Sequence, residues 1–88
     1  MKRVRVVVSG RVQGVFFRDS ARRRAASAGV AGWVSNRPDG SVEAVFEGDD
    51  DAVESMVAFM GEGPRGASVE NVERSDEDPE GMSEFEIR

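Results

Sequence analysis

Apolar and polar side chains alternate in several short segments of the chain, and this alternation predicts β-strands. In residues 3–9, Val4, Val6 and Val8 fall on one face, and the arginines between them fall on a face that we expect to be solvated. We expect further strands over residues 32–36, 41–48, 67–74 and 84–88. The Arg-Pro-Asp-Gly stretch between the first two of these is typical of a hairpin turn, so they should pair antiparallel. In residues 67–74 the alternation is imperfect, which indicates a bulge. Trp33 and Phe46 are expected in the core.

Two segments instead have the spacing of amphipathic helices. In residues 19–28, alanines recur on one face and arginines lie mostly off it, which would let the helix pack close to a sheet. In residues 49–60, apolar side chains follow the i, i+3, i+4, i+7 pattern and acidic residues crowd the first turn. Gly29 and Gly61 are the expected helix ends.

The order of these elements is strand, helix, strand, strand, helix, strand, followed by a short terminal strand. This order is typical of an α+β ferredoxin-like two-layer sandwich (βαββαβ), in which an antiparallel sheet carries two helices on one face. The chain has 88 residues and no repeat or linker, so we expect a single domain over residues 1–88. This fold serves many functions, and the function must therefore be argued from a site.

The composition excludes several kinds of chemistry. The chain has no cysteine, histidine or tyrosine, which rules out disulfides, thiolate nucleophiles, histidine acid–base catalysis and the usual zinc sites. We expect neither a metal nor a cofactor. No apolar run approaches the roughly 20 residues of a membrane span, and the run at the start is too short for a signal peptide. We therefore expect a cytoplasmic protein that does not bind membranes.

The formal net charge of −5 is unevenly distributed. Residues 1–24 hold eight basic residues and one acidic residue, whereas residues 39–88 hold 16 acidic and three basic residues. The basic third could indicate nucleic-acid binding, but arginines on solvated faces explain it equally well. An RNA-binding sheet of this topology needs aromatic side chains on its central strands, and Phe46 is the only one there. Because an acidic chain also repels phosphate backbones, we expect no nucleic-acid partner.

The acidic excess also bears on habitat and assembly. The chain has one lysine against 11 arginines, and together with the acidity this suggests a halophilic protein from a salty cytoplasm where carboxylate repulsion is screened. The same acidity favours a soluble monomer.

The segment GRVQGVFFR, residues 10–18, connects the first strand to the first helix. Gly10 and Gly14 permit positive φ and a close approach of the backbone to a ligand, and a helix start presents unpaired amides. The positive charge of Arg18 lies near the positive end of the helix dipole, which is unfavourable. An anion held between the guanidinium and the amides would offset this cost. The pattern predicts an anion site, and the alternative is a flexible connection with an exposed arginine. The segment matches neither the Walker loop nor the dinucleotide fingerprint.

GRVQGVFFR and the later GWVSNRPDGSVE, residues 32–43, resemble the acylphosphatase family. The resemblance continues through FEG at residues 46–48, the second helix and the final F-x-I strand, and so covers nearly the whole chain. It implies the ferredoxin-like fold and metal-independent hydrolysis of carboxylic–phosphoric mixed anhydrides. Ser20 stands where threonine is usual, and Ala28-Gly29-Val30 replaces a common Leu-Gly-Leu. Neither departure touches the implied chemistry.

The resemblance also implies a role for individual residues. Arg18 would bind the phosphoryl group and Asn36 would orient the attacking water. Backbone amides of the preceding loop would hold the phosphoryl oxygens. The loop residues concerned are Val12, Gln13, Gly14, Val15, Phe16 and Phe17. Phe16 and Phe17 cannot both point inward from one strand, so one of them is a candidate for the pocket rim.

The implied chemistry suits these residues, because an acyl phosphate is already activated and its leaving carboxylate needs little protonation. Positioning and charge stabilisation suffice. Asn36 is a poor base, so we expect a phosphoryl oxygen of the substrate to take the proton. Taken without the resemblance, Asn36 would be an ordinary turn residue. The remaining alternative function is a non-catalytic anion-binding or acyl-phosphate-binding regulatory domain of the same fold.

Overall fold

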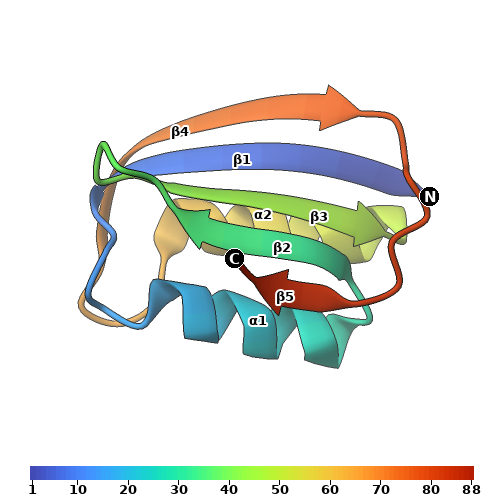
Figure 1. Cartoon of the computed structure of the whole chain (residues 1–88), viewed down its shortest axis with the longest axis horizontal. Helices are drawn as coiled ribbons and strands as arrows, with labels where there is room; N and C mark the ends of the chain where they lie inside the picture. Colours follow the sequence, from blue (N-terminus) through green and yellow to red (C-terminus); the bar gives the residue numbers. More distant parts are fainter.

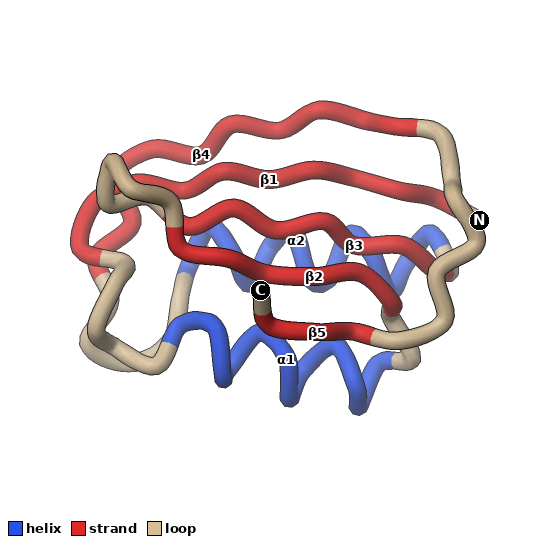
Figure 2. The backbone as a smooth tube through the Cα atoms, in the orientation of Figure 1, coloured by secondary structure: helices blue, strands red, loops and turns tan.

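The alternating segments of the sequence form one sheet, and the two helical segments lie together on one of its faces (Figures 1 and 2). The computed structural model describes all residues, Met1–Arg88. The elements are β1 (Lys2–Arg11), α1 (Phe17–Ala28), β2 (Ala31–Asn36), β3 (Val42–Gly48), α2 (Asp50–Glu62), β4 (Ser68–Glu77) and β5 (Phe85–Ile87). This confirms the ferredoxin-like α+β sandwich.

The sheet has the strand order β4-β1-β3-β2-β5, and its pairs are antiparallel except at one edge. There β5 pairs parallel with β2, so the sheet is mixed, and the expectation of a purely antiparallel sheet was wrong for the terminal strand. The reason lies in the connection. The chain leaves β4 at the end of the sheet where β2 begins, and it must run alongside β2 in the same direction (Figure 1).

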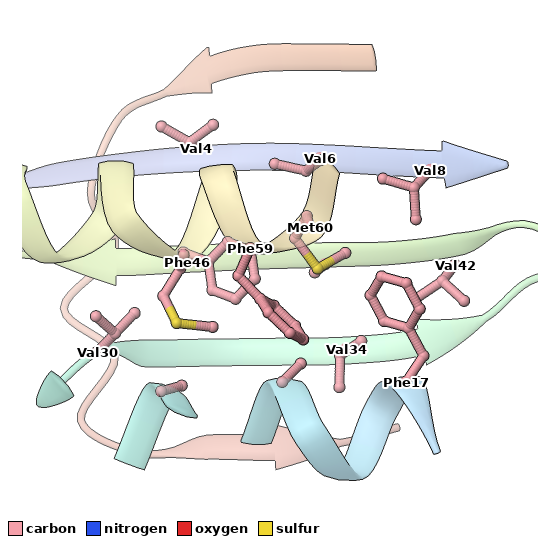
Figure 3. Close-up of a cluster of buried hydrophobic side chains, with 14 of the residues drawn as sticks. Val4, Val6, Val8, Phe17, Val30, Val34, Val42, Phe46, Phe59 and Met60 are labelled. Atoms are coloured by element: carbon pink, nitrogen blue, oxygen red, sulfur yellow. The ribbon is translucent and has the colours of Figure 1, made fainter. Parts of the chain in front are cut away.

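A core of valine, alanine, phenylalanine and methionine side chains fills the space between the sheet and the helices (Figure 3). Val4, Val6 and Val8 are fully buried, as their alternation predicts. Phe17 of α1 meets Phe59 of α2 with ring centroids 5.7 Å apart. Burying a phenylalanine or valine side chain contributes roughly 1.5–3 kcal/mol. These side chains fix the start of α1 against the sheet, and the predicted site lies there.

Trp33 lies outside this core, contrary to expectation. The arginine side chains of Arg5 and Arg88 lie over its ring, at 5.5 and 5.0 Å from the centroid. Alternation explains the difference, because the next residue, Val34, is fully buried and points to the opposite face. Phe46 is fully buried, as expected, and stacks on Phe85 of β5 at 5.6 Å.

Some element boundaries also differ from the expected ones. Helix α1 begins at Phe17 and α2 continues through Gly61 to Glu62, where Gly63 at φ 76° ends it. The bulge in β4 is present, since Ser9 pairs with Asn71 whereas the next residue of β1 pairs with Val69. The extra residue on β4 keeps the edge strand in register with β1 on both sides of the bulge.

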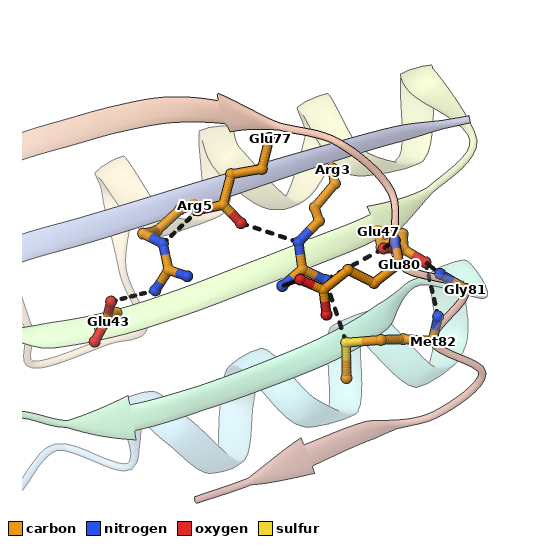
Figure 4. Close-up of polar contacts among 8 residues, drawn as sticks. All are labelled: Arg3, Arg5, Glu43, Glu47, Glu77, Glu80, Gly81 and Met82. Atoms are coloured by element: carbon orange, nitrogen blue, oxygen red, sulfur yellow. Dashed lines mark hydrogen bonds and ion pairs between the residues drawn. The ribbon is translucent and has the colours of Figure 1, made fainter.

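Arg3 is buried, although the sequence placed it on a solvated face. Its guanidinium pairs with Glu47 at 3.2 Å and with Glu77 at 3.0 Å (Figure 4). Glu47 also accepts hydrogen bonds from the backbone N–H groups of Glu80, Gly81 and Met82 at 2.8–2.9 Å. These bonds hold the connection after β4 and thereby direct β5 to the edge of β2.

We predict that this network makes the protein sensitive to acid. Burial raises the pKa of Glu47, but the three N–H donors and Arg3 outweigh it, and the pKa lies below the ordinary 4.5. Arg5 and Arg3 lower the pKa of Glu77 in the same way. A carboxylate with a depressed folded-state pKa stabilises the fold above its unfolded-state pKa and loses that contribution as the pH falls through the folded-state value. The free energy of unfolding should therefore decline below about pH 4.5.

Urea unfolding of Glu47→Gln tests this prediction. Removing one partner of a buried ion pair costs about 3–5 kcal/mol at pH 7, and the variant should lose part of the acid dependence. Glu86→Gln is the matched control, because Glu86 forms an exposed pair with Arg88 and should change stability by about 0.5 kcal/mol or less. Equal stabilities of the two variants would contradict the assigned role of Glu47.

Candidate functional site

The connection between β1 and α1 leaves a run of backbone amides without intrachain partners. No N–H from Val12 to Phe16 donates to a backbone carbonyl. The first hydrogen bond of the helix is donated by the Ser20 N–H to the Phe16 carbonyl at 3.0 Å. The N–H groups of the first helical residues precede that bond and have no carbonyl within the helix. Amides of this kind, at a helix N-terminus, are suited to bind an anion.

A pocket of about 330 Å³ lies beside these amides. Its walls come from the loop, the start of α1, the end of β2 and the terminal strand β5. The lining residues are Val12, Gly14, Phe16, Phe17, Arg18, Asp19, Asn36 and Ile87. The fold thus brings Arg18 and Asn36, which are far apart in sequence, to one pocket together with most of the predicted loop residues.

Arg18 is half-buried and forms no ion pair within the chain. The neighbouring carboxylate of Asp19 pairs instead with Arg23, one helical turn on, at 3.2 Å. The Arg18 guanidinium therefore keeps its donors available at the pocket. A planar guanidinium beside unpaired amides can grip the oxygens of a phosphoryl or carboxylate group.

Asn36 is the last residue of β2 and pairs with Val42 at the start of β3. Its backbone carbonyl accepts a hydrogen bond from the Ser35 hydroxyl at 3.2 Å. Its side chain is half-buried and lines the pocket. An amide side chain offers one acceptor and two donors, so it can hold a water molecule without acting as a strong base.

Gln13 connects the two halves of the site without lining the pocket. Its side-chain amide donates to the carbonyls of Arg37 and Ser41, at 2.9 Å each. Both acceptors lie in the turn that follows Asn36, and the Arg37 N–H also bonds the Ser41 carbonyl at 2.9 Å. The bonds of Gln13 therefore fix the loop relative to the end of β2. Val15 likewise does not line the pocket but packs against the core.

The two glycines of the GRVQGVFFR segment have different roles. Gly14, at φ 75°, lines the pocket, and a Cβ there would meet no atom within 4 Å. Gly10, at φ 120°, belongs to β1, and a Cβ there would collide with the Ser68 carbonyl of β4. The expectation of a ligand approach thus fits Gly14, whereas Gly10 serves strand packing.

Sequence reasoning missed Asp19 and Ile87 as lining residues. Asp19 immediately follows Arg18, so its place is a consequence of the helix beginning at Phe17. Ile87 reaches the pocket because β5 pairs parallel with β2, and only the final F-x-I pattern hinted at that strand. A larger hollow of about 620 Å³ lies between the helices and holds neither Arg18 nor Asn36.

The chain shows neither a metal-binding cluster nor a membrane-spanning helix. No group of three or more His, Cys, Asp or Glu side chains is arranged to hold a metal ion. Neither helix has the length and apolar character needed to cross a membrane.

Comparison with known proteins gives one consistent result. The Acylphosphatase family model matches residues 4–87. An acylphosphatase of Rubrobacter xylanophilus is 60% identical over 99% of this chain and 80% of that protein. One of Haloarcula marismortui is 57% identical over 98% of this chain and 94% of that protein. The crystal structure of acylphosphatase from Bacillus subtilis matches with a TM-score of 0.95 at 37% identity, covering 100% of this chain and 99% of that one.

Proposed function

Because this chain belongs to the acylphosphatase family and is an acyl-phosphate hydrolase, we propose that Arg18, the loop amides and Asn36 carry out its reaction. Arg18 and the amides from Val12 to Phe17 hold the phosphoryl group, and Asn36 orients the attacking water. The observation that carries this proposal is the run of loop amides without backbone partners, beside a pocket that both side chains line.

Phosphoryl capture needs several donors that converge on one small group. The Arg18 guanidinium supplies a planar fork of N–H donors and a full positive charge, and the loop amides supply further donors. Since these groups are held by the fold, they need no reorganisation as charge develops on the phosphoryl oxygens. The loop position itself depends on the two hydrogen bonds of Gln13 to the turn after Asn36.

Hydrolysis then requires one water and no strong base. The side-chain carbonyl of Asn36 accepts a hydrogen bond from the water and directs its oxygen at phosphorus. The new bond forms between phosphorus and the water oxygen. At the same time the bond between phosphorus and the oxygen that bridges to the acyl group breaks, and the electrons of this broken bond stay with the leaving carboxylate. The proton of the water passes to a phosphoryl oxygen. A carboxylate leaves unprotonated near pH 7, because carboxyl groups have pKa values of about 4.

Hydrolysis of benzoyl phosphate in water enriched in oxygen-18 tests where the bond breaks. We predict that the label enters inorganic phosphate and is absent from benzoate, because Asn36 directs water at phosphorus. Mass spectrometry of both products reads the outcome directly. The spontaneous reaction without enzyme, run in parallel, supplies the background. Enrichment of benzoate in the enzymatic reaction would mean attack at the carbonyl carbon and would remove the role given to Asn36.

We further propose that the enzyme needs no metal and acts as a cytoplasmic monomer on a small acyl phosphate, without nucleic-acid partners. The activated substrate and the charge of Arg18 support the first point, and the net charge of −5 supports the monomeric state and the absence of nucleic-acid partners. The acidic excess also supports adaptation to concentrated salt. No observation favours the alternative of a non-catalytic regulatory domain.

A further inference from the structure

Phe16 is an unusual residue of the pocket, because its large apolar side chain is 80% exposed. The chain has few exposed side chains of this kind, and two of them, Phe16 and Ile87, line the pocket that holds Arg18. Phe17, the next residue, is buried in the core. An aromatic ring kept in water at the mouth of a charged pocket gives the fold little stability and is available to a ligand.

The backbone at Phe16 is strained as well. It is the only residue other than glycine with a positive φ, at φ 60° and ψ 29°. The left-handed conformation is unfavourable for a bulky side chain, and glycine or asparagine would adopt it more easily. Phe16 also occupies the N-cap position of α1 without making a side-chain cap hydrogen bond. Neither local structure nor packing therefore accounts for a phenylalanine here, and strained residues of this kind gather at functional sites.

The direction of the reaction indicates which part of a substrate meets Phe16. In an in-line displacement the leaving group lies opposite the attacking water. Asn36 ends β2 and Ile87 lies on the adjacent strand β5, opposite Val34, so both belong to the sheet side of the pocket. Phe16 belongs to the loop side. Because Phe16 and Asn36 come from different elements of the pocket wall, a water held at Asn36 leaves the Phe16 wall free for the acyl group.

We propose that Phe16 binds the acyl group of the substrate and sets a preference for aromatic or other large apolar acyl phosphates over acetyl phosphate. This inference rests on the proposed function. An aromatic acyl group can stack on the Phe16 ring, and an aliphatic one can cover it, whereas an acetyl group offers a single methyl. Benzoate and acetate are leaving groups of similar basicity, so a difference in turnover between their phosphates reports contact with the acyl group.

The test compares kcat/KM for benzoyl phosphate and acetyl phosphate in the wild type, Phe16→Asn and Phe16→Tyr. Asparagine removes the ring and tolerates the left-handed backbone, so the fold should survive. We expect the wild type to prefer benzoyl phosphate and Phe16→Asn to lower the benzoyl-to-acetyl ratio about tenfold, the lower end of what an apolar contact supplies. The change should lie mainly in KM for benzoyl phosphate. Phe16→Tyr, which keeps the ring, should retain the wild-type ratio.

Val72→Ala serves as the control, because Val72 is an exposed apolar residue of β4 that does not line the pocket, and it should leave the benzoyl-to-acetyl ratio within about twofold of the wild type. The inference is overturned if Phe16→Asn lowers kcat/KM for both substrates by the same factor, or if Val72→Ala shifts the ratio as much as Phe16→Asn does. In those cases hydrolysis itself, and so the proposed function, still stands. If the wild type hydrolyses neither compound, the proposed function fails and the inference fails with it.

Discussion

Arg18→Ala should lower kcat/KM for benzoyl phosphate by about 10³-fold or more. Loss of one preorganised donor typically costs 10²–10³ in rate, and Arg18 combines a donor fork with a full charge. Its guanidinium has no competing ion pair, because the adjacent Asp19 pairs with Arg23. Competitive inhibition by inorganic phosphate should weaken in the same variant, since phosphate binds through the same contacts. Steady-state kinetics with and without phosphate measure both effects.

Arg22→Ala is the matched control for this substitution. Arg22 lies on the same helix, its side chain is exposed and forms no ion pair, and it is not among the residues that line the pocket. We expect activity within about twofold of the wild type, because substitutions of exposed side chains without such contacts usually have small effects. Arg18→Lys should recover only part of the lost rate, since an ammonium keeps the charge without the planar fork. An Arg18→Ala enzyme within tenfold of the wild type would contradict phosphoryl capture by this residue.

Asn36→Ala should lower kcat by at least about 10²-fold while KM and phosphate inhibition change little. The side chain acts on the water and not on the phosphoryl group, so its loss removes an interaction that matters in the transition state. The alanine variant should remain folded, because the half-buried side chain lies at the end of β2 beside an open pocket.

Ser35→Ala controls for changes at the end of β2, because Ser35 is the preceding residue and points to the other face of the sheet. We expect it to keep kcat within about threefold of the wild type. If Asn36→Ala instead raised KM strongly at unchanged kcat, Asn36 would be a binding residue and the water would have to be positioned by another group.

Local sequence signals were sufficient for the antiparallel strands of the sheet, the two helices and the loop between β1 and α1. Alternation placed Val4, Val6 and Val8 inside, and the hairpin turn gave the antiparallel pair of β2 and β3. Arg18 and Asn36 reach one pocket, as the motif resemblance implied. These features depend on short stretches of chain or on a pattern that relatives share.

Other features depend on contacts between distant segments of the chain, and no local sequence pattern predicts these contacts. Arg3 is buried because Glu47 and Glu77, 44 and 74 residues away, surround its guanidinium. An alternating strand gives the same pattern whether an arginine is solvated or paired in this way. Gln13 bonds the turn at Arg37, and a glutamine in a loop gives no sign of such a contact.

The terminal strand is the clearest case. Its three residues, Phe85–Ile87, are too few to specify a partner by their own pattern. Backbone hydrogen bonds flank this strand on both sides. The Gly32 N–H donates to the Glu84 carbonyl at 2.9 Å, and the Arg88 N–H donates to the Val34 carbonyl at 2.8 Å. The Glu47 contacts to the preceding connection direct it to this edge. Ile87 enters the site as a result of these long-range bonds.

The most direct test of the central claim is benzoyl phosphate hydrolysis by the wild type and Asn36→Ala, side by side, with EDTA present and in molar KCl. We expect rapid metal-independent turnover by the wild type and a loss of at least about 10²-fold in the variant, with circular dichroism showing both folded. A folded wild type without turnover above the spontaneous rate would contradict hydrolysis at this site. Equal turnover by the two proteins would contradict the role of Asn36.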